Sequence, residues 1–233
     1  MERPFTDVLP AEAMKICAGI GSSTVGPNYC LAGGTGLALQ IKHRRSNDLD
    51  FILIDHKKKS LDPGLVSVLE RIFPEVSLFV NLQESTQLDL TLAGIKITFL
   101  AYPFPLINLP VKGAALAPFL KGTLLASPQE IALMKAYSIG RRATFRDYID
   151  LYFLLIEQAV DLAYIEEKAQ VKYTTNSKSG FSMKLFLEQL VYTADLADQE
   201  AAIKMVFKEG LTVEAIENYL TGRVKEYLKS NFY

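Results

Sequence analysis

The stretch from Leu31 to Phe51 constrains this chain more than any other part of its sequence. It places a glycine pair, Gly33 and Gly34, at the start of an expected helix, and two carboxylates, Asp48 and Asp50, on the apolar strand that follows. Because strand side chains repeat every second residue, both carboxylates should point to the same side. Two such groups repel each other unless a cation lies between them, so they predict a divalent metal site. A glycine-lined helix start binds phosphate, so the stretch predicts nucleotide chemistry.

The composition permits such an enzyme. The chain has 233 residues, of which 49% are hydrophobic and 22% charged, so it can bury a core as one large or two small domains. Its net charge of −1 gives no global attraction for nucleic acid. Binding of RNA would have to come from local basic runs, at residues 42–45, 57–59 and 141–142, which by default are solvated surface.

Two features indicate the compartment. Cys17 and Cys30 are the two cysteines, too few for a disulfide framework and without metal-ligand spacing. The N-terminus does not resemble a signal peptide, and no apolar run approaches ~18 residues. We therefore predict a cytoplasmic protein with both cysteines in its core and no membrane partner.

Hydrophobic periodicity predicts a mixed first part and a helical second part. The expected fold class is α+β (mixed α/β), with a small mixed β-sheet and flanking helices in residues 1–126, and a C-terminal helical domain in residues 127–233. A segment with four prolines (102–122) should be a linker or wrapping segment. Strands are expected at 29–32, 49–54, 76–82, 87–92 and 95–100, and helices at 10–20, 35–43 and 63–73.

The glycine motif has alternative interpretations. Gly33-Gly34 fits a tight turn whose backbone N–H groups could hold a triphosphate, or simply a turn. Gly34-Thr-Gly36 also matches the start of a dinucleotide-binding fingerprint, which would indicate an oxidoreductase. The third glycine is missing and the downstream acid is doubled, which favours a metal over ribose recognition.

The combination of motifs resembles a known family. Gly33-Gly34, a helix, Asp48-Leu-Asp50-Phe51, the preceding His43-Arg-Arg-Ser46, and the later stretches at 130–135 and 146–151 are similar to nucleotidyltransferase-fold proteins of the AbiEii/AbiGii toxin type. The resemblance covers about residues 28–156. It implies a sheet of nucleotidyltransferase type and the toxin half of a toxin–antitoxin or phage-defence pair, with an antitoxin protein as a partner.

The resemblance also implies a reaction. Asp48 and Asp50 would hold Mg²⁺ on the phosphates of a nucleoside triphosphate (NTP), an acceptor hydroxyl would attack the α-phosphorus, and pyrophosphate would leave. The acceptor could be RNA, such as a tRNA end. The residues that would contact the nucleotide are Gly33, Gly34, Thr35, Arg44 and Ser46.

Two later residues join the candidate catalytic set by the same resemblance. Lys135 follows a clear helix start, with Ser127 as N-cap and Glu130 completing a capping box; the lysine could neutralise charge on the phosphates or lie on the surface. Asp147 and Asp150 share one face of a helix that is apolar on nearly every side, so they need partners. Arg142 and Arg146 are the structural candidates. We favour a functional role beside Lys135 for Asp150, and a structural role for Asp147.

One position departs from the family pattern. Nucleotidyltransferases usually carry a third carboxylate on a later strand, where this chain has Thr98. A two-residue hairpin loop at Ala93-Gly94 would place Asp89 opposite Thr98, so Asp89 could supply that carboxylate from the neighbouring strand. A slip of one residue would send Asp89 to the other face. The alternative function is a catalytically impaired nucleotidyltransferase-fold protein that binds a nucleotide or a protein partner.

Overall fold

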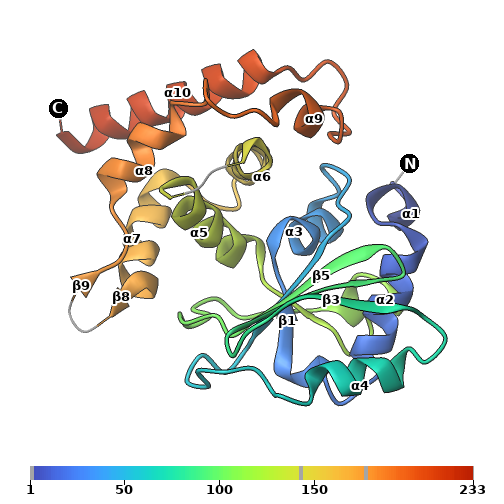
Figure 1. Cartoon of the computed structure of the whole chain (residues 1–233). Coiled ribbons are helices and arrows are strands. Elements are labelled where there is room, and N and C mark those ends of the chain that lie inside the picture. The colour runs from blue at the N-terminus through green and yellow to red at the C-terminus, as the bar shows by residue number, and fades with distance from the viewer. Residues whose placement is uncertain (1–2, 142–143, 176–177, 233) are drawn as a thin grey trace. The chain divides into compact units, whose positions relative to one another are not determined.

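The computed structural model describes residues 3–141, 144–175 and 178–232, and its contacts divide the chain into two compact units (Figure 1). The first unit ends at Ser127 and the second begins at Pro128, one residue after the boundary expected from the sequence.

Seven strands of the described residues form one mixed sheet in the first unit, in the order β3-β4-β5-β2-β1-β7-β6. Strand β1 pairs with β7, and β2 with β5, in parallel, while the other neighbours are antiparallel. The strands are β1 (Tyr29–Leu31), β2 (Leu49–Leu53), β3 (Leu78–Gln83), β4 (Gln87–Leu92), β5 (Ile95–Leu100), β6 (Val111–Lys112) and β7 (Leu124–Leu125).

Helices cover this sheet because its strands are apolar. Strand β2 is buried along Phe51, Ile52 and Leu53, as expected for a strand covered on both faces. Figure 1 shows α3 and α4 on opposite sides of the sheet. The helical elements of this unit are α1 (Phe5–Val8), α2 (Ala11–Gly21), α3 (Gly33–Ile41), α4 (Leu65–Ile72), and the short 3₁₀ turns η1 (Gly26–Asn28), η2 (Gly113–Ala115) and η3 (Pro118–Leu120).

The hairpin between β4 and β5 has the predicted register. Leu92 pairs with Ile95, and Asp89 pairs with Thr98. Ala93 and Gly94 both have positive φ, 51° and 78°, which is typical of the type I′ turn whose twist suits a two-residue hairpin. The prediction of this register is confirmed.

The segment expected to be a linker is partly a strand. Its residues 111–112 form β6, which pairs with β7 at the edge of the sheet beside β1. Neither strand was predicted, because two residues are too short to show an alternating pattern. The turn before β7 packs directly against the backbone at the end of α2. A Cβ on Gly122, at φ +82°, would lie 2.1 Å from the carbonyl oxygen of Gly21.

The second unit is helical, as predicted, apart from a small hairpin. Its helices are α5 (Pro128–Ile139), α6 (Phe145–Ile156), α7 (Leu162–Tyr173), α8 (Met183–Leu190), α9 (Gln199–Ile203) and α10 (Val213–Phe232), and β8 (Thr174–Thr175) pairs with β9 (Lys178–Ser179). Helix α6 is buried along nearly its whole length. In the described ranges, no helix is both long and apolar enough to cross a membrane. Cys17 and Cys30 are both buried in the first unit, as expected.

Candidate nucleotide site

The turn from β1 into α3 lies directly against Asp50. Gly33 has φ +61°, and a Cβ at this residue would lie 2.3 Å from Asp50 Oδ2. The backbone N–H of Ala32 donates a hydrogen bond of 2.8 Å to the carbonyl oxygen of Asp50. Glycine is therefore required here twice, by the backbone conformation and by the neighbouring carboxylate. The glycine turn and one acid of the predicted metal pair form a single site.

Asp48 precedes the first residue of β2, and its backbone is held by α3. Asp48 and Asp50 are each half-buried, while Leu49 between them is buried. This alternation agrees with two carboxylates on one side of an extended chain. The Thr35 hydroxyl donates a hydrogen bond to the carbonyl oxygen of Asp48 and accepts one of 2.6 Å from the Ser46 hydroxyl. Helix α3 therefore fixes the position of the acid pair.

Three residues predicted to contact a nucleotide lie in the interior. Thr35, Arg44 and Ser46 are 1%, 2% and 6% exposed. Arg44 Nη1 donates a hydrogen bond of 2.9 Å to the carbonyl oxygen of Arg45, and the N–H of Ser46 donates one of 2.9 Å to Val8. In this structure these side chains hold the segment before β2 in place, whereas Gly33 and Gly34 are half-exposed at the start of α3. Burial of this segment is a tertiary effect that the local sequence does not reveal.

Asp50, Thr98 and Asp89 form one row across three neighbouring strands. Asp50 on β2 pairs with Thr98 on β5, and Thr98 pairs with Asp89 on β4. Directly paired residues lie on the same face of a sheet. Since neighbouring strands lie ≈ 4.8 Å apart, the Cα atoms of Asp50 and Asp89 are about 10 Å apart. Asp89 therefore faces the same side as Asp50, with Thr98 between them.

The Asp89 carboxylate is oriented and only partly satisfied. Gln87 Nε2 donates a hydrogen bond of 2.8 Å to Asp89 Oδ2. Asp89 Oδ1 is buried and has no hydrogen-bond partner among the described residues. A buried carboxylate oxygen without a partner is costly unless a cation or donor joins it. The sequence did not single out Gln87, because a glutamine two residues before an acid is an ordinary strand pattern.

The donor set fits a magnesium ion that arrives with a nucleotide. Within the described ranges, no group of three or more His, Cys, Asp or Glu side chains is placed to hold a metal. Mg²⁺ is commonly bound through one or two carboxylates together with substrate phosphates. Asp48 and Asp50, beside the glycine turn, match that pattern without a third ligand.

In the second unit, Lys135 on α5 forms ion pairs with two acids of α6. Its Nζ lies 2.7 Å from Asp147 Oδ1 and 2.7 Å from Asp150 Oδ2. The Asp150 side chain is fully buried. Asp147 Oδ2 also accepts hydrogen bonds of 3.2 Å from the backbone N–H and the hydroxyl of Thr144, closing a capping box. Asp147 thus caps its own helix, and both Asp147 and Asp150 contact Lys135. Arg142, a candidate partner, lies outside the described residues.

Glu130 has a partner that the sequence did not indicate. Its carboxylate lies 2.5 Å from Nζ of Lys172 on α7, and both side chains are fully buried. Burial lowers the pKa of Lys172, while the nearby Glu130 carboxylate opposes that shift. The capping-box interpretation of Glu130 rested on local spacing and missed this contact, because the two residues are 42 positions apart.

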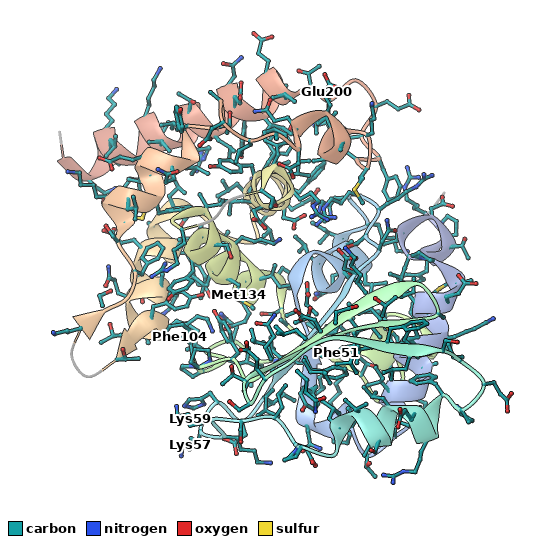
Figure 2. The ribbon with its side chains drawn as sticks, in the orientation of Figure 1. Phe51, Lys57, Lys59, Phe104, Met134 and Glu200 are labelled. Atoms are coloured by element: carbon teal, nitrogen blue, oxygen red, sulfur yellow. The ribbon has the colours of Figure 1, made fainter. Side chains whose placement is uncertain are left out.

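The basic runs differ in their surroundings. Lys57 and Lys59 are exposed on the loop after β2 and extend outward from it in Figure 2. Lys42 lies over the ring of Phe5, with Nζ 4.3 Å from the ring centroid. Arg141 packs over the ring of Tyr137, at 3.4 Å. The loop at 57–59 is therefore a solvated positive patch, while Lys42 and Arg141 also pack on aromatic rings.

The mixed sheet, with a glycine turn against an Asp-x-Asp strand, defines a protein of the nucleotidyltransferase fold. The model of the family described as "Nucleotidyl transferase AbiEii toxin, Type IV TA system" matches residues 16–221. The chain belongs to this AbiEii toxin family, as its motifs indicated.

Individual proteins are similar to this chain in sequence or in fold. Protein aq_aa25 of Aquifex aeolicus (strain VF5), itself uncharacterized, is 30% identical over 205 residues, covering 87% of this chain and 89% of its own length. MenT4, a nucleotidyltransferase toxin of Mycobacterium tuberculosis H37Rv, is similar in structure, with a TM-score of 0.56 and 20% identity over 91% of this chain and 80% of its own. JHP933 from Helicobacter pylori has a TM-score of 0.53 and 14% identity, over 94% and 89% of the two chains.

Proposed function

We propose that this protein is a Mg²⁺-dependent nucleotidyltransferase that moves a nucleotide from an NTP to an acceptor hydroxyl. The observation that carries the proposal is the contact between Gly33 and Asp50, which joins a phosphate-binding turn and a metal-binding carboxylate in one site. Membership of a nucleotidyl transferase toxin family supports the same reaction class.

Each part of this site has a role in the proposal. The backbone N–H groups of Gly33 and Gly34, at the positive end of α3, bind the phosphates. Asp48 and Asp50 are the ligands for Mg²⁺. When bound, the metal would neutralise phosphate charge and stabilise the attacking and leaving oxygens. Thr35, Arg44 and Ser46 act as positioning residues, because their polar groups are used inside the protein.

We assign the third carboxylate to Asp89. Three observations support this: its place in the row with Asp50 and Thr98, the hydrogen bond from Gln87, and its unpartnered Oδ1. Thr98 itself has no charge with which to hold a metal or accept a proton. Asp89 would orient or deprotonate the acceptor hydroxyl.

In the second unit, we assign Lys135 and Asp150 to the catalytic machinery. The family resemblance gives these two positions their role, and the 2.7 Å ion pair between them supports it. The Asp150 carboxylate pairs with Lys135 and fixes the direction of the lysine side chain.

We propose RNA, such as a tRNA end, as the acceptor, and an antitoxin protein as a partner. The family is described as part of a type IV toxin–antitoxin system, and the structurally similar MenT4 is a nucleotidyltransferase toxin. The solvated lysines at 57–59 are compatible with a polyanionic acceptor. The test is incubation with each labelled NTP, Mg²⁺ and total cellular RNA, followed by a search for label on RNA or on the protein itself.

A second candidate is a protein of the same fold that binds nucleotide without transferring it. The observation that favours it is Thr98, together with the absence of a three-carboxylate group from the described residues. Metal-dependent NTP binding with no label transferred to any acceptor would support this candidate over the first.

A further inference from the structure

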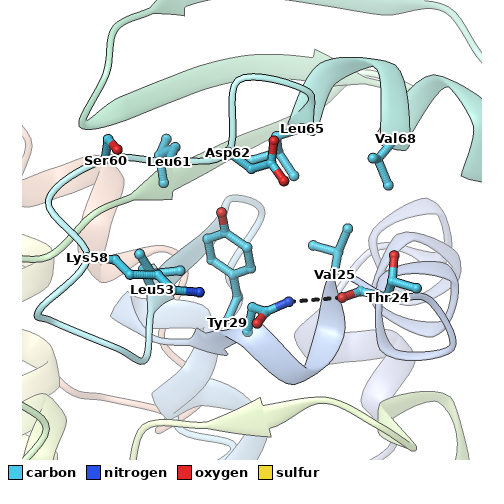
Figure 3. A pocket seen from close by; sticks show the side chains of 11 residues that line it. Thr24, Val25, Tyr29, Leu53, Lys58, Ser60, Leu61, Asp62, Leu65 and Val68 are labelled. Carbon is cyan, nitrogen blue, oxygen red and sulfur yellow. Dashed lines mark hydrogen bonds between the residues drawn. The ribbon is translucent and has the colours of Figure 1, made fainter.

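A cavity of about 400 Å³ lies at the end of β1 and β2, between the sheet and α4 (Figure 3). Its walls come from three parts of the first unit: the turn η1 before β1, the loop between β2 and α4, and α4 itself. The apolar lining includes Leu53, Leu61, Leu65 and Val68. Such a volume and lining are typical of sites for small molecules.

This cavity is separate from the nucleotide site. Tyr29 pairs with Leu53 across β1 and β2, so both side chains lie on the same face of the sheet. Leu53 follows Asp50 by three residues on one continuous strand, and strand side chains alternate between faces. The cavity therefore opens on the face opposite to Asp50 and Thr98.

Tyr29 contributes a hydroxyl group to the lining of the cavity. The residue is 4% exposed, and its ring packs edge-to-face on Phe99 with the centroids 5.0 Å apart. Its hydroxyl points towards the segment that carries Leu61 and Asp62 in Figure 3. Among the described residues this hydroxyl has no hydrogen-bond partner. Burial, with a smaller contribution from the Asp62 charge, raises the pKa of Tyr29 to about 12, so the phenol is neutral and can donate or accept.

Two opposite charges line the same cavity without pairing. Lys58 and Asp62 both contribute to the lining. Neither forms an ion pair with the other or with any residue that the structure describes. Asp62 Oδ1 accepts a hydrogen bond of 2.8 Å from the N–H of Gly64, which fixes the carboxylate near the mouth. The cavity thus offers an anion, a cation and a phenol around an apolar wall.

We propose that this cavity binds a small zwitterion with an apolar side chain, of the free amino-acid class. Its ammonium group would lie between the Tyr29 hydroxyl and the Asp62 carboxylate, its carboxylate would pair with Lys58, and its side chain would pack on Leu61, Leu65 and Val68. A ligand with both charges satisfies all three polar groups at once, which a purely apolar or singly charged molecule cannot do.

The proposal can be tested by calorimetry on the whole protein with three probes that differ only in charge. These are L-leucine, 4-methylpentanoate, which lacks the ammonium group, and 3-methylbutylamine, which lacks the carboxylate. We expect L-leucine to bind. Each analogue should have a dissociation constant at least about tenfold higher, because a charge-assisted contact is lost. No heat with L-leucine at about 10 mM, where a millimolar site is saturated, or equal binding of all three probes, would overturn the proposal.

Variants locate the site. Tyr29→Phe removes only the hydroxyl, and Asp62→Asn keeps the oxygen that accepts from Gly64 while removing the charge; both should weaken L-leucine binding about tenfold. Lys58→Met should weaken it as well, whereas the matched control Lys57→Met, on the same loop but outside the lining, should not. The double variant Asp48→Ala with Asp50→Ala should bind L-leucine as the unaltered protein does. Loss of binding in that double variant, or equal effects of the two lysine substitutions, would contradict the assignment.

Discussion

At the scale of single residues, the account depends on the contact between Gly33 and Asp50. The glycine has positive φ and leaves space for a carboxylate that any Cβ would displace. A turn chosen only for its conformation would tolerate a small side chain on its outer surface. Here the side chain would meet Asp50, which is proposed to hold the metal. Both the positive φ and the nearby carboxylate therefore require glycine at residue 33.

Gly33→Ala should therefore impair both binding and stability. An alanine with left-handed conformation costs about 1–2 kcal/mol, and its Cβ would push Asp50 aside. We expect Mg²⁺-dependent NTP binding to weaken about tenfold or more, measured by calorimetry. Gly222→Ala is the matched control: its Cβ would meet nothing within 4 Å, and a helical alanine should stabilise by about 0.5–1 kcal/mol. Unchanged NTP binding in Gly33→Ala would exclude this turn from the site.

The assignment of Asp89 can be tested by removing its carboxylate from β4 and placing one at residue 98 on the neighbouring strand β5. Asp89→Asn should lower nucleotide transfer at least about a hundredfold, the scale of a lost general base. Adding Thr98→Asp to that variant should restore part of the activity, because residue 98 lies beside Asp50 in the same row. Thr98→Asn is the control and should restore none. Full transfer by Asp89→Asn alone would show that the third carboxylate is not Asp89.

Because the Lys172–Glu130 ion pair is buried, removal of one of its charges should strongly lower the free energy of unfolding. Lys172→Met leaves Glu130 buried without its cation, which should lower the free energy of unfolding by about 3–5 kcal/mol. Combining it with Glu130→Gln should recover most of the loss, because no unpaired charge remains. Lys168→Met, on the same helix but in an exposed pair, should lower the free energy of unfolding far less, because solvent screens that pair. Urea denaturation measures all three, and equal losses at the two lysines would contradict the account.

At the scale of elements, the hairpin between β4 and β5 shows what sequence can predict. In its two strands buried residues alternate with partly or fully exposed ones, and both strands have the bounds predicted from that alternation. The two-residue loop then fixes the pairing of Asp89 with Thr98. Strands β6 and β7 could not be found in this way. A strand of two residues is too short to show an alternating pattern, and it forms through pairing with neighbouring strands.

The same turn provides a prediction about stability. Ala93 has φ 51°, which an L-residue with a Cβ adopts at a cost and asparagine adopts more readily. Ala93→Asn should stabilise the first unit by about 0.5–1 kcal/mol, seen as a higher midpoint in thermal unfolding. Ala93→Val, β-branched at the same position, should lower the midpoint. A hairpin that tolerates valine as well as asparagine would not contain the type I′ turn described.

At the scale of the whole molecule, local motifs predicted the fold and the family, while tertiary contacts determine the surroundings of several residues. Gly33-Gly34 and Asp48-x-Asp50 were recognisable because each motif is short and contiguous. The burial of Arg44 and Ser46, and the pairing of Glu130 with Lys172, join segments far apart in the chain. No local spacing could have indicated those contacts.

Transfer of label from an NTP by the variant Asp48→Ala with Asp50→Ala tests the central claim most directly. The account predicts Mg²⁺-dependent transfer to RNA or to protein by the unaltered chain, loss of that transfer in the double variant, and an unchanged circular dichroism spectrum. Transfer at the original level by the folded double variant would contradict it.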